Sequence, residues 1–210
     1  MARVVCVADG REVDLDYFVE WRPYLWARPV ARALELLGDL RGMRVLEVGG
    51  RYGRMAVLFG LLGAQVTMVE RDGQARARAK VATWGVAHRV RLIRTDGSLH
   101  EIAGEWFDVL SNESVLYGVA DLGSFIDGLG AHLVDSGKAA FVENVCGGAA
   151  RQWLQLCVFR RWRSQPVHGT RPDQAPLFAA RYDGPQVRQR RATVYTILGR
   201  KKPKQGVAHP

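Results

Sequence analysis

Cysteine is scarce in this chain of 210 residues. Its three cysteines, Cys6, Cys146 and Cys157, are widely spaced, and no two of them form a C-x-x-C pair. An odd number of separated cysteines predicts neither a disulfide framework nor a zinc site. The five histidines also lack carboxylate neighbours at metal-ligand spacing. We therefore expect reduced thiols and chemistry that needs no metal.

Long hydrophobic runs are absent as well. The longest stretch without a charged residue, Met55 to Val69, contains Gly60 and Gly63 and is shorter than a membrane span. The apolar segment of a secretory signal is missing from the amino-terminal MARVVCVADGRE. These features predict a cytoplasmic protein that does not cross a membrane.

Acidic residues are few in the carboxyl-terminal part. Residues 151–210 carry 13 Lys and Arg but only Asp173 and Asp183, which gives a net charge of +11. Residues 1–150 have a net charge of −2. A polyanion or an anionic substrate could therefore bind the carboxyl-terminal part. Arginine-rich helices and edge strands are also often simply solvated, and the composition does not decide between these interpretations.

The segment from Arg44 to Asp72 has the pattern of a strand–helix–strand unit. Its short apolar runs are bounded by glycines, as expected for parallel strands buried on both faces. The predicted elements are a strand at 44–48, a glycine-rich turn at 49–53, a helix at 54–62 and a second strand at 65–69. In such a unit the turn and the end of the second strand meet at one edge of the sheet, where a ligand can bind.

Three features of this edge indicate a nucleoside that carries an anion. Gly49 and Gly53 have no side chains, so the backbone can approach a ligand closely. The amino terminus of the following helix presents free N–H groups to a carboxylate or phosphate. Glu70 follows Gly49 by 21 positions and is placed to accept hydrogen bonds from two ribose hydroxyls.

The glycine pattern narrows the choice of nucleoside. The dinucleotide fingerprint G-x-G-x-x-G is incomplete, because the turn reads G-G-R-Y-G-R from Gly49. The pattern E-x-G-x-x-x-G, from Glu47 to Gly53, instead resembles the first motif of class I S-adenosylmethionine (SAM) dependent methyltransferases. That family usually has (D/E)-x-G-x-G-x-G, and Arg51 stands in the place of the middle glycine. The resemblance covers residues 41–200.

The resemblance implies a doubly wound, Rossmann-like α/β fold with a seven-stranded sheet whose last strand is antiparallel. It also implies SAM as methyl donor and S-adenosylhomocysteine (SAH) as product. Glu47 would lie near the methionine end of SAM, and Glu70 would hold the ribose. Asp96 would contact the adenine amino group, and Asn112 would emerge beside the sulfonium. The predicted cofactor-binding residues are Glu47, Gly49, Gly50, Gly53, Glu70, Arg71, Asp96, Gly97 and Asn112.

Later segments continue the alternation of strands and helices. The predicted elements are strands at 90–94 and 107–111, a helix at 121–134, a turn at 135–137, and strands at 139–142, 186–191 and 193–198. The last two resemble the strands that complete the family's sheet. We expect three parts in the chain: an amino-terminal hairpin and helical lid at 1–40, the SAM-binding domain at 41–200, and a disordered basic tail at 201–210.

Aromatic residues are concentrated before the first strand of this unit. Asp9-Gly10 lies between two β-prone runs and predicts a hairpin, and Pro29 is expected to open a helix. In the resembled family this region often caps the substrate pocket. Trp21, Tyr24 and Trp26 are therefore predicted to form a substrate lid. Packing of the same rings against the sheet is the alternative.

Methyl transfer is an in-line displacement, so the enzyme must align the acceptor and exclude water. A hydroxyl acceptor also needs a base near the point of attack. Glu113 is the first candidate, because it follows the predicted fourth strand. Tyr117, Glu143 and His168 are further candidates for the catalytic site.

The resemblance predicts a SAM-dependent methyltransferase of specialised metabolism, of the kind used in antibiotic biosynthesis. Its acceptor would be a small molecule, anionic or bound to a carrier. The segment Ser111 to Ser114 lacks the N-P-P-(Y/W/F) motif, which argues against amino-directed base methylation. A nucleic-acid methyltransferase and a non-catalytic SAM-binding partner subunit remain alternatives, as does NAD chemistry. A homodimer is compatible with the sequence.

Overall fold

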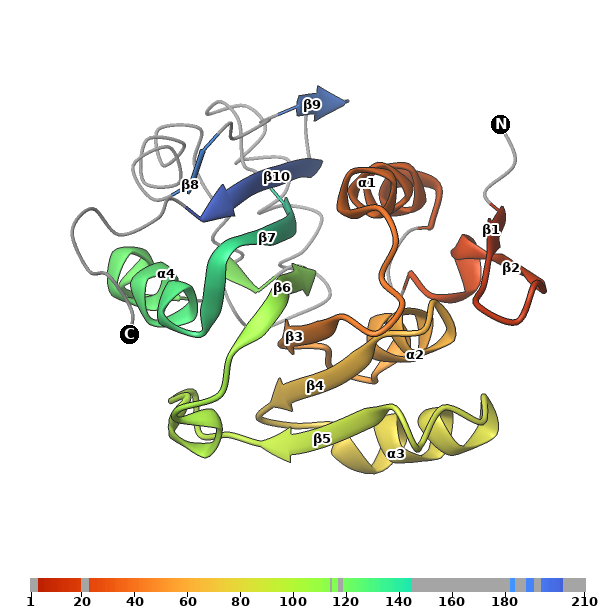
Figure 1. The fold of residues 1–210 in the computed structure, drawn as a ribbon, viewed down its shortest axis with the longest axis horizontal. Coiled ribbons are helices and arrows are strands. Elements are labelled where there is room, and N and C mark those ends of the chain that lie inside the picture. The colour runs from red at the N-terminus through yellow and green to blue at the C-terminus, as the bar shows by residue number, and fades with distance from the viewer. Residues whose placement is uncertain are drawn as a thin grey trace, which may run out of the picture.

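The computed structural model describes residues 4–19, 23–113, 115–116, 119–144, 182–183, 188–190 and 194–201. Its main element is a sheet in the strand order β5-β4-β3-β6-β7-β10-β8, with helices on both faces (Figure 1). Five of these strands are parallel: β3 (Arg44–Val48), β4 (Gln65–Glu70), β5 (Val90–Arg94), β6 (Phe107–Glu113) and β7 (Leu133–Asn144). The predicted Rossmann-like α/β fold with a parallel sheet is confirmed.

Strand order reverses beside β3. From β3 the chain adds β4 and then β5 on one side, and it returns to add β6 and β7 on the other. Such a switch point leaves a crevice beyond the carboxyl ends of the two central strands. The predicted glycine-rich turn follows β3 directly, so it lies at this switch point.

The remaining strands are antiparallel to their neighbours. β10 (Val194–Lys201) pairs with β7, and two short strands, β8 (Tyr182–Asp183) and β9 (Arg188–Arg190), pair with β10. Near the amino terminus, β1 (Val4–Cys6) pairs with β2 (Glu12–Asp14) in a separate two-stranded sheet, followed by the 3-10 turn η1 (Leu15–Tyr17). Of the predicted tail at 201–210, Lys201 is the last residue of β10, and the rest lies outside the described residues.

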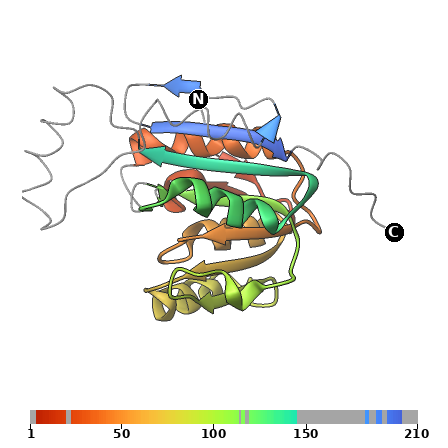
Figure 2. The same cartoon turned by 90° about the vertical axis from the view of Figure 1, so that its left-hand side faces the viewer.

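Two hydrophobic cores lie on opposite faces of the sheet. On one face, α1 (Pro23–Leu37), α2 (Arg54–Leu61) and α3 (Gln74–Thr83) cover residues such as Val45 and Met68. On the other, α4 (Leu122–Ala131) and η2 (His100–Ile102) cover residues such as Leu46 and Leu110. Successive residues of a strand point to opposite faces, which is why Val45 and Leu46 belong to different cores. Figure 2 shows α4 in front of the sheet and α1 behind it.

The first helix begins earlier than the sequence predicts. We expect Pro29 to open it, but α1 starts at Pro23 and continues through Pro29. Proline is tolerated in a first helical turn, where its missing N–H has no helical partner. At position 29 the lost hydrogen bond is offset by burial of Ala27, Val30, Ala33 and Leu37 against the sheet. Tyr24 and Trp26 therefore belong to α1.

The predicted helix at 121–134 is too long. α4 ends at Ala131, and β7 already begins at Leu133. The predicted turn lies inside this strand as an irregularity: Ser136 has a φ of 63°, and the register moves from Phe107 opposite Leu133 to Val109 opposite Lys138. The residues predicted to form a turn do interrupt the regular geometry of the strand. The pairing of β7 with β6 nevertheless continues on both sides of the interruption.

Candidate active site

The carboxyl edge of the sheet brings together the ends of four parallel strands. Val48 lies opposite Val69 on one side and Asn112 on the other, and Glu70 lies opposite Arg94. The segments that follow β3, β4 and β5 therefore leave the sheet side by side, next to the end of β6. Every predicted cofactor-binding residue lies on one of these segments or strand ends.

The glycine-rich turn follows a left-handed path despite its missing glycine. Gly49, Arg51 and Gly53 have φ values of 72°, 48° and 74°. Arg51, which stands in the place of the family's middle glycine, thus adopts a left-handed conformation. For a residue with a Cβ atom this conformation costs about 1 to 2 kcal/mol. The turn is closed by hydrogen bonds from Gly49 N–H to Val69 O (2.9 Å) and from Gly53 N–H to Gly50 O (2.7 Å). The turn is therefore compact although Arg51 replaces the motif's middle glycine.

Gly53 fixes the distance between the turn and α3. A Cβ atom at this position would lie 2.9 Å from Ala77 Cβ and 3.2 Å from Ala77 Cα. Ala77 is fully buried, so it has no room to move away. Any side chain at position 53 would push the start of α2 away from α3.

Glu70 connects the end of β4 to the turn. Its Oε2 accepts the N–H of Arg51 at 2.7 Å, and its Oε1 accepts those of Arg71 (2.7 Å) and Asp72 (3.1 Å). The carboxylate is half-buried and keeps further acceptor capacity, because each oxygen can take more than one hydrogen bond. The sequence predicts the ribose contact but gives no signal for the bond to Arg51.

Two buried polar side chains lie beside the turn. Glu47 is 1% exposed, and a Cβ atom on Gly50 would lie 2.5 Å from its Oε1. Gly50 therefore leaves space for the Glu47 carboxylate, a role that the motif pattern alone does not reveal. Asn112 is 2% exposed, and neither its Nδ2 nor its Oδ1 has a hydrogen-bond partner among the described residues.

A buried amide without partners costs about 1 to 3 kcal/mol. Asn112 borders a small cavity of about 10 Å³, roughly the space of one water molecule. The other lining residues come mainly from the apolar sides of α1 and α2, including Val30, Ala33 and Met55. A ligand with both a donor and an acceptor would relieve the cost at Asn112, and the amino-acid end of SAM offers both. The described residues of this edge thus fit the donor that the motif implies.

Asp96 and Gly97 form a tight turn after β5. The Ser98 N–H donates to Asp96 Oδ1 at 2.9 Å, and these hydrogen bonds from Ser98 lower the pKa of the Asp96 carboxyl. Thr95 N–H donates to Glu70 O at 3.1 Å, which joins this turn to the end of β4. Asp96 is exposed and ionised at neutral pH, so it is available as an acceptor for an amino group.

The catalytic candidates are only partly located. Glu113 is the last residue of β6, two positions later than the predicted strand end, and it lies opposite Val142 of β7. Glu143 follows Val142, so the two glutamates come from adjacent positions of neighbouring strands. Trp21, Tyr117 and His168 lie outside the described residues. The lid prediction for Tyr24 and Trp26 concerns side chains that the structure does not describe.

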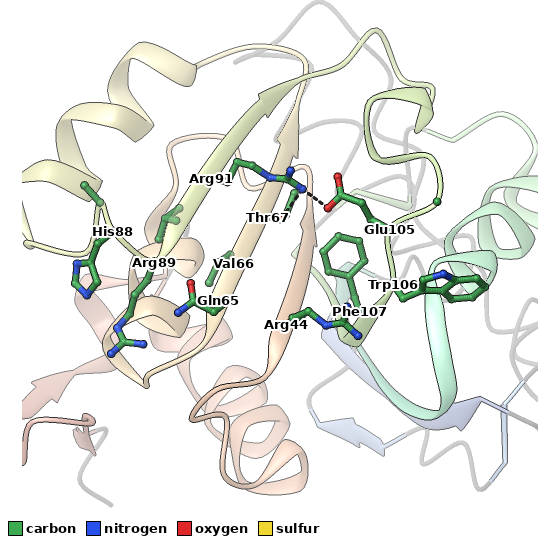
Figure 3. A pocket seen from close by; sticks show the side chains of 13 residues that line it. Arg44, Gln65, Val66, Thr67, His88, Arg89, Arg91, Glu105, Trp106 and Phe107 are labelled. Carbon is green, nitrogen blue, oxygen red and sulfur yellow. Dashed lines mark hydrogen bonds and ion pairs between the residues drawn. The ribbon is translucent and has the colours of Figure 1, made fainter.

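A second hollow, of about 540 Å³, opens at the opposite, amino edge of the sheet (Figure 3). The strand starts Arg44, Gln65, Val90 and Phe107 line it. Its three arginines all have partners: Arg91 forms an ion pair with Glu105 and donates to Thr67 Oγ1 at 3.2 Å, Arg44 forms an ion pair with Asp108, and Arg89 donates to Gly63 O at 3.1 Å. None of the predicted site residues that the structure describes lines this hollow.

Two absences concern the described part of the chain. It contains no group of three His, Cys, Asp or Glu side chains that could hold a metal ion. None of its helices combines the length and the apolar character needed to span a membrane.

Three solved structures illustrate the similarity in fold, and two of them are named as methyltransferases. The YcgJ protein of Bacillus subtilis superposes with a TM-score of 0.68 at 12% identity, covering 84% of this chain and 99% of that one. The N-methyltransferase NodS of Bradyrhizobium japonicum, solved with SAH, gives 0.62 at 18% identity, with 90% and 93% covered. The magnesium protoporphyrin IX methyltransferase ChlM of Synechocystis, with bound SAH, gives 0.64 at 10% identity, with 88% and 89% covered.

Identities this low establish a shared fold and nothing finer. No curated protein matches the sequence. The family is established by a separate comparison: residues 18–177 match the family model described as a methyltransferase domain. That match spans most of the chain and includes the glycine-rich turn, Glu70, Asp96 and Asn112. This chain therefore belongs to the methyltransferase domain family.

Proposed function

We propose that this protein transfers a methyl group from SAM to a small-molecule acceptor at the carboxyl edge of its sheet. The observation that carries the proposal is the position of the Glu70 carboxylate. It lies at the end of β4 and accepts the N–H of Arg51 in the glycine-rich turn. The Glu70 carboxylate therefore lies at the strand end that would bind the nucleoside and also contacts the glycine-rich turn.

SAM supplies a methyl group on a positively charged sulfur, and the described residues can hold each of its parts. Glu70 accepts hydrogen bonds from the ribose hydroxyls, and Asp96 accepts one from the adenine amino group. Glu47 and Asn112, both buried beside the turn, bind the amino-acid end. Two carboxylates near the donor also favour its positive charge in a site of low dielectric constant.

The acceptor binds at this edge, beside the end of β6, and α1 packs against the same strand. Ser111 and Asn112 of β6 lie across a small cavity from Val30 and Ala33 of α1, so the helix shields this part of the site from water. Glu113 is the first candidate for the base, because it follows Asn112 directly at the end of β6. A base at this place would remove the acceptor's proton as the methyl group arrives.

A small acceptor, such as a specialised metabolite, is favoured by two considerations. The segment after Asn112 does not contain the motif of amino-directed base methylation. The acceptor of the structurally similar ChlM is magnesium protoporphyrin IX, a small molecule, and that chain is covered over 89% of its length. The fold therefore accommodates a small acceptor without an additional nucleic-acid module.

Calorimetric titration with SAH tests the proposal. Glu70→Ala should weaken SAH binding by about 1 to 3 kcal/mol, because hydrogen bonds to a charged group are lost. Asp72→Ala is the matched control: it removes a nearby exposed acid whose contact is a 3.5 Å ion pair with Arg71, and it should bind SAH normally. Unchanged SAH affinity in Glu70→Ala, or tighter binding of NAD than of SAH by the wild type, would contradict the assignment.

A further inference from the structure

One flank of α3 carries a row of cations and aromatic rings. Arg76, Lys80 and Trp84 are spaced four residues apart and therefore lie on the same side of the helix and its cap. Tyr52, from the glycine-rich turn, contacts one end of this row, and Tyr17, from η1, contacts the other. We call these five residues the α3 stripe.

The Tyr52 end of the stripe concentrates positive charge. The Arg76 Cζ lies 5.0 Å from the centroid of the Tyr52 ring, and the Lys80 Nζ lies 5.4 Å from it. Arg51 adds a third cation at 5.2 Å. A cation over the face of an aromatic ring is attracted by the ring's negative face. Within the described residues, none of the three cations forms an ion pair with a carboxylate, so their charge is not neutralised there.

The Tyr17 end of the stripe presents an aromatic ring to solvent. Tyr17 is 68% exposed, and its ring meets that of Trp84 edge to face, with centroids 5.9 Å apart. Arg54 Nη1 donates to the Tyr17 backbone oxygen at 3.0 Å and fixes this part of the chain to α2. Phe18 packs behind the pair, 5.1 Å from Trp84. The exposed ring is therefore held in position, which reduces the entropy that a partner must remove on binding.

The helix itself offers no compensating negative charge. Its sequence QARARAKVAT contains Arg76, Arg78 and Lys80 but no acid. Arg78 lies on the opposite flank of the helix from Lys80, so the two cationic sides can be tested separately. Exposed Tyr, Trp and Arg side chains are the types that contribute most to protein interfaces.

We propose that the α3 stripe docks an acidic segment of a partner protein beside the methyl-transfer edge. A protein fits better than a nucleic acid, because single strands bind by stacking successive bases on several open rings. In the stripe only Tyr17 is open; Tyr52 is already surrounded by cations, and Trp84 is half-buried. This inference goes beyond the proposed function and does not depend on the identity of the acceptor.

The test uses the full-length chain and a fluorescently labelled peptide of repeated Glu and Leu, followed by anisotropy. Lys80→Glu should weaken binding of this peptide about tenfold or more, because an attractive charge becomes a repulsive one. The matched control is Arg78→Glu, which changes the net charge equally on the other flank of the same helix and should leave binding within about twofold. Tyr17→Ser should also weaken binding, and as an exposed substitution it leaves folding intact.

Several outcomes would overturn the proposal. If Lys80→Glu and Arg78→Glu lose the same peptide affinity, the effect is one of net charge rather than of the α3 stripe. Tighter binding of an oligothymidylate of equal charge would identify a nucleic-acid surface, and absence of peptide binding would remove the surface altogether. If Lys80→Glu fails to fold, Tyr17→Ser alone decides the question. SAH affinity should stay at the wild-type level in both variants, so a failure here is distinct from a failure of the cofactor assignment.

Discussion

The two edges of the central sheet differ in how their polar groups are satisfied. At the amino edge the larger hollow, about 540 Å³, is lined by arginines that already have partners: Arg91 pairs with Glu105, Arg44 pairs with Asp108, and Arg89 donates to Gly63 O. At the carboxyl edge Asn112 is buried without a described partner, and Glu70 keeps acceptor capacity. Under the proposed function, the comparison teaches that unsatisfied polar groups are a better guide to the ligand site than open volume.

The difference follows from the direction of the strands. Parallel strands place the starts of α2 and α3 at the carboxyl edge, and helix starts have N–H groups without helical partners. In the segments that lead into these helices, the Arg51, Arg71 and Asp72 N–H groups converge on one carboxylate. At the amino edge the chain enters each strand, and the ion pairs Arg91–Glu105 and Arg44–Asp108 join residues near these strand starts.

The largest expected effect concerns the packing of the carboxyl edge. Gly53→Ala should lower the free energy of unfolding by about 2 to 4 kcal/mol, because left-handed strain adds to overpacking against Ala77. The control is Gly85→Ala, which has a similar φ of 71° but nothing within 4 Å of the added Cβ. It should cost only about 1 to 2 kcal/mol. If Gly53→Ala and Gly85→Ala lose the same free energy of unfolding in urea titrations, the turn and α3 are not closely packed.

The next effect separates stability from binding at Asn112. Asn112→Leu removes the partnerless amide, so the ligand-free protein should become more stable by about 1 to 3 kcal/mol. SAH binding should weaken by about 1 to 2 kcal/mol, because the hydrogen bonds to its amino-acid end are lost. Ser111→Ala, one position earlier on the same strand, should change neither quantity much. Loss of stability without loss of SAH affinity in Asn112→Leu would mean that this amide is structural.

A smaller effect is expected at the amino edge. Arg91 and Glu105 are both partly exposed, so a double-mutant cycle with alanine should give a coupling of about 0.2 to 1 kcal/mol in stability. SAH affinity should be unaltered in both single variants. A change in SAH affinity comparable to that of Glu70→Ala would place ligand binding in the hollow and reverse the comparison of the edges.

The smallest effect is a pH dependence at Asp96. Hydrogen bonds from Ser98 lower the pKa of this carboxyl below the ordinary value of 3.8. A carboxyl whose pKa falls on folding stabilises the folded state above its unfolded pKa, and the contribution is lost as the pH falls through the folded value. Asp96→Asn should therefore flatten the fall in stability below pH 3.8. An unaltered acid profile would mean that the Ser98 bonds are not maintained in solution.

Local patterns in the sequence were enough to locate the strand–helix–strand unit. The predicted strand at 44–48 has the same bounds as β3, and the predicted helix at 54–62 is one residue longer than α2. These boundaries are encoded by neighbouring residues, since glycines end the apolar runs. The edge at which Glu70, Asp96 and Asn112 meet was also predictable, because parallel topology places consecutive strand ends together.

Contacts between distant residues could not be predicted in the same way. The bond from Arg51 to Glu70 depends on a left-handed residue where the motif has glycine, and Gly50 is explained only by the buried Glu47 carboxylate. The early start of α1 depends on burial against the sheet, which outweighs the local signal of Pro29. Tertiary packing decides each of these features, and a single sequence does not record it.

Hydrogen–deuterium exchange with and without SAH tests the central claim most directly, because it compares both edges in one measurement. We predict that SAH slows exchange in the glycine-rich turn at 49–53, at Glu70 to Asp72 and at the 95–98 turn. Exchange around the hollow, at 87–91 and 104–107, should remain the same. Protection confined to the hollow, with no change at the turn or beside Glu70, would contradict the account.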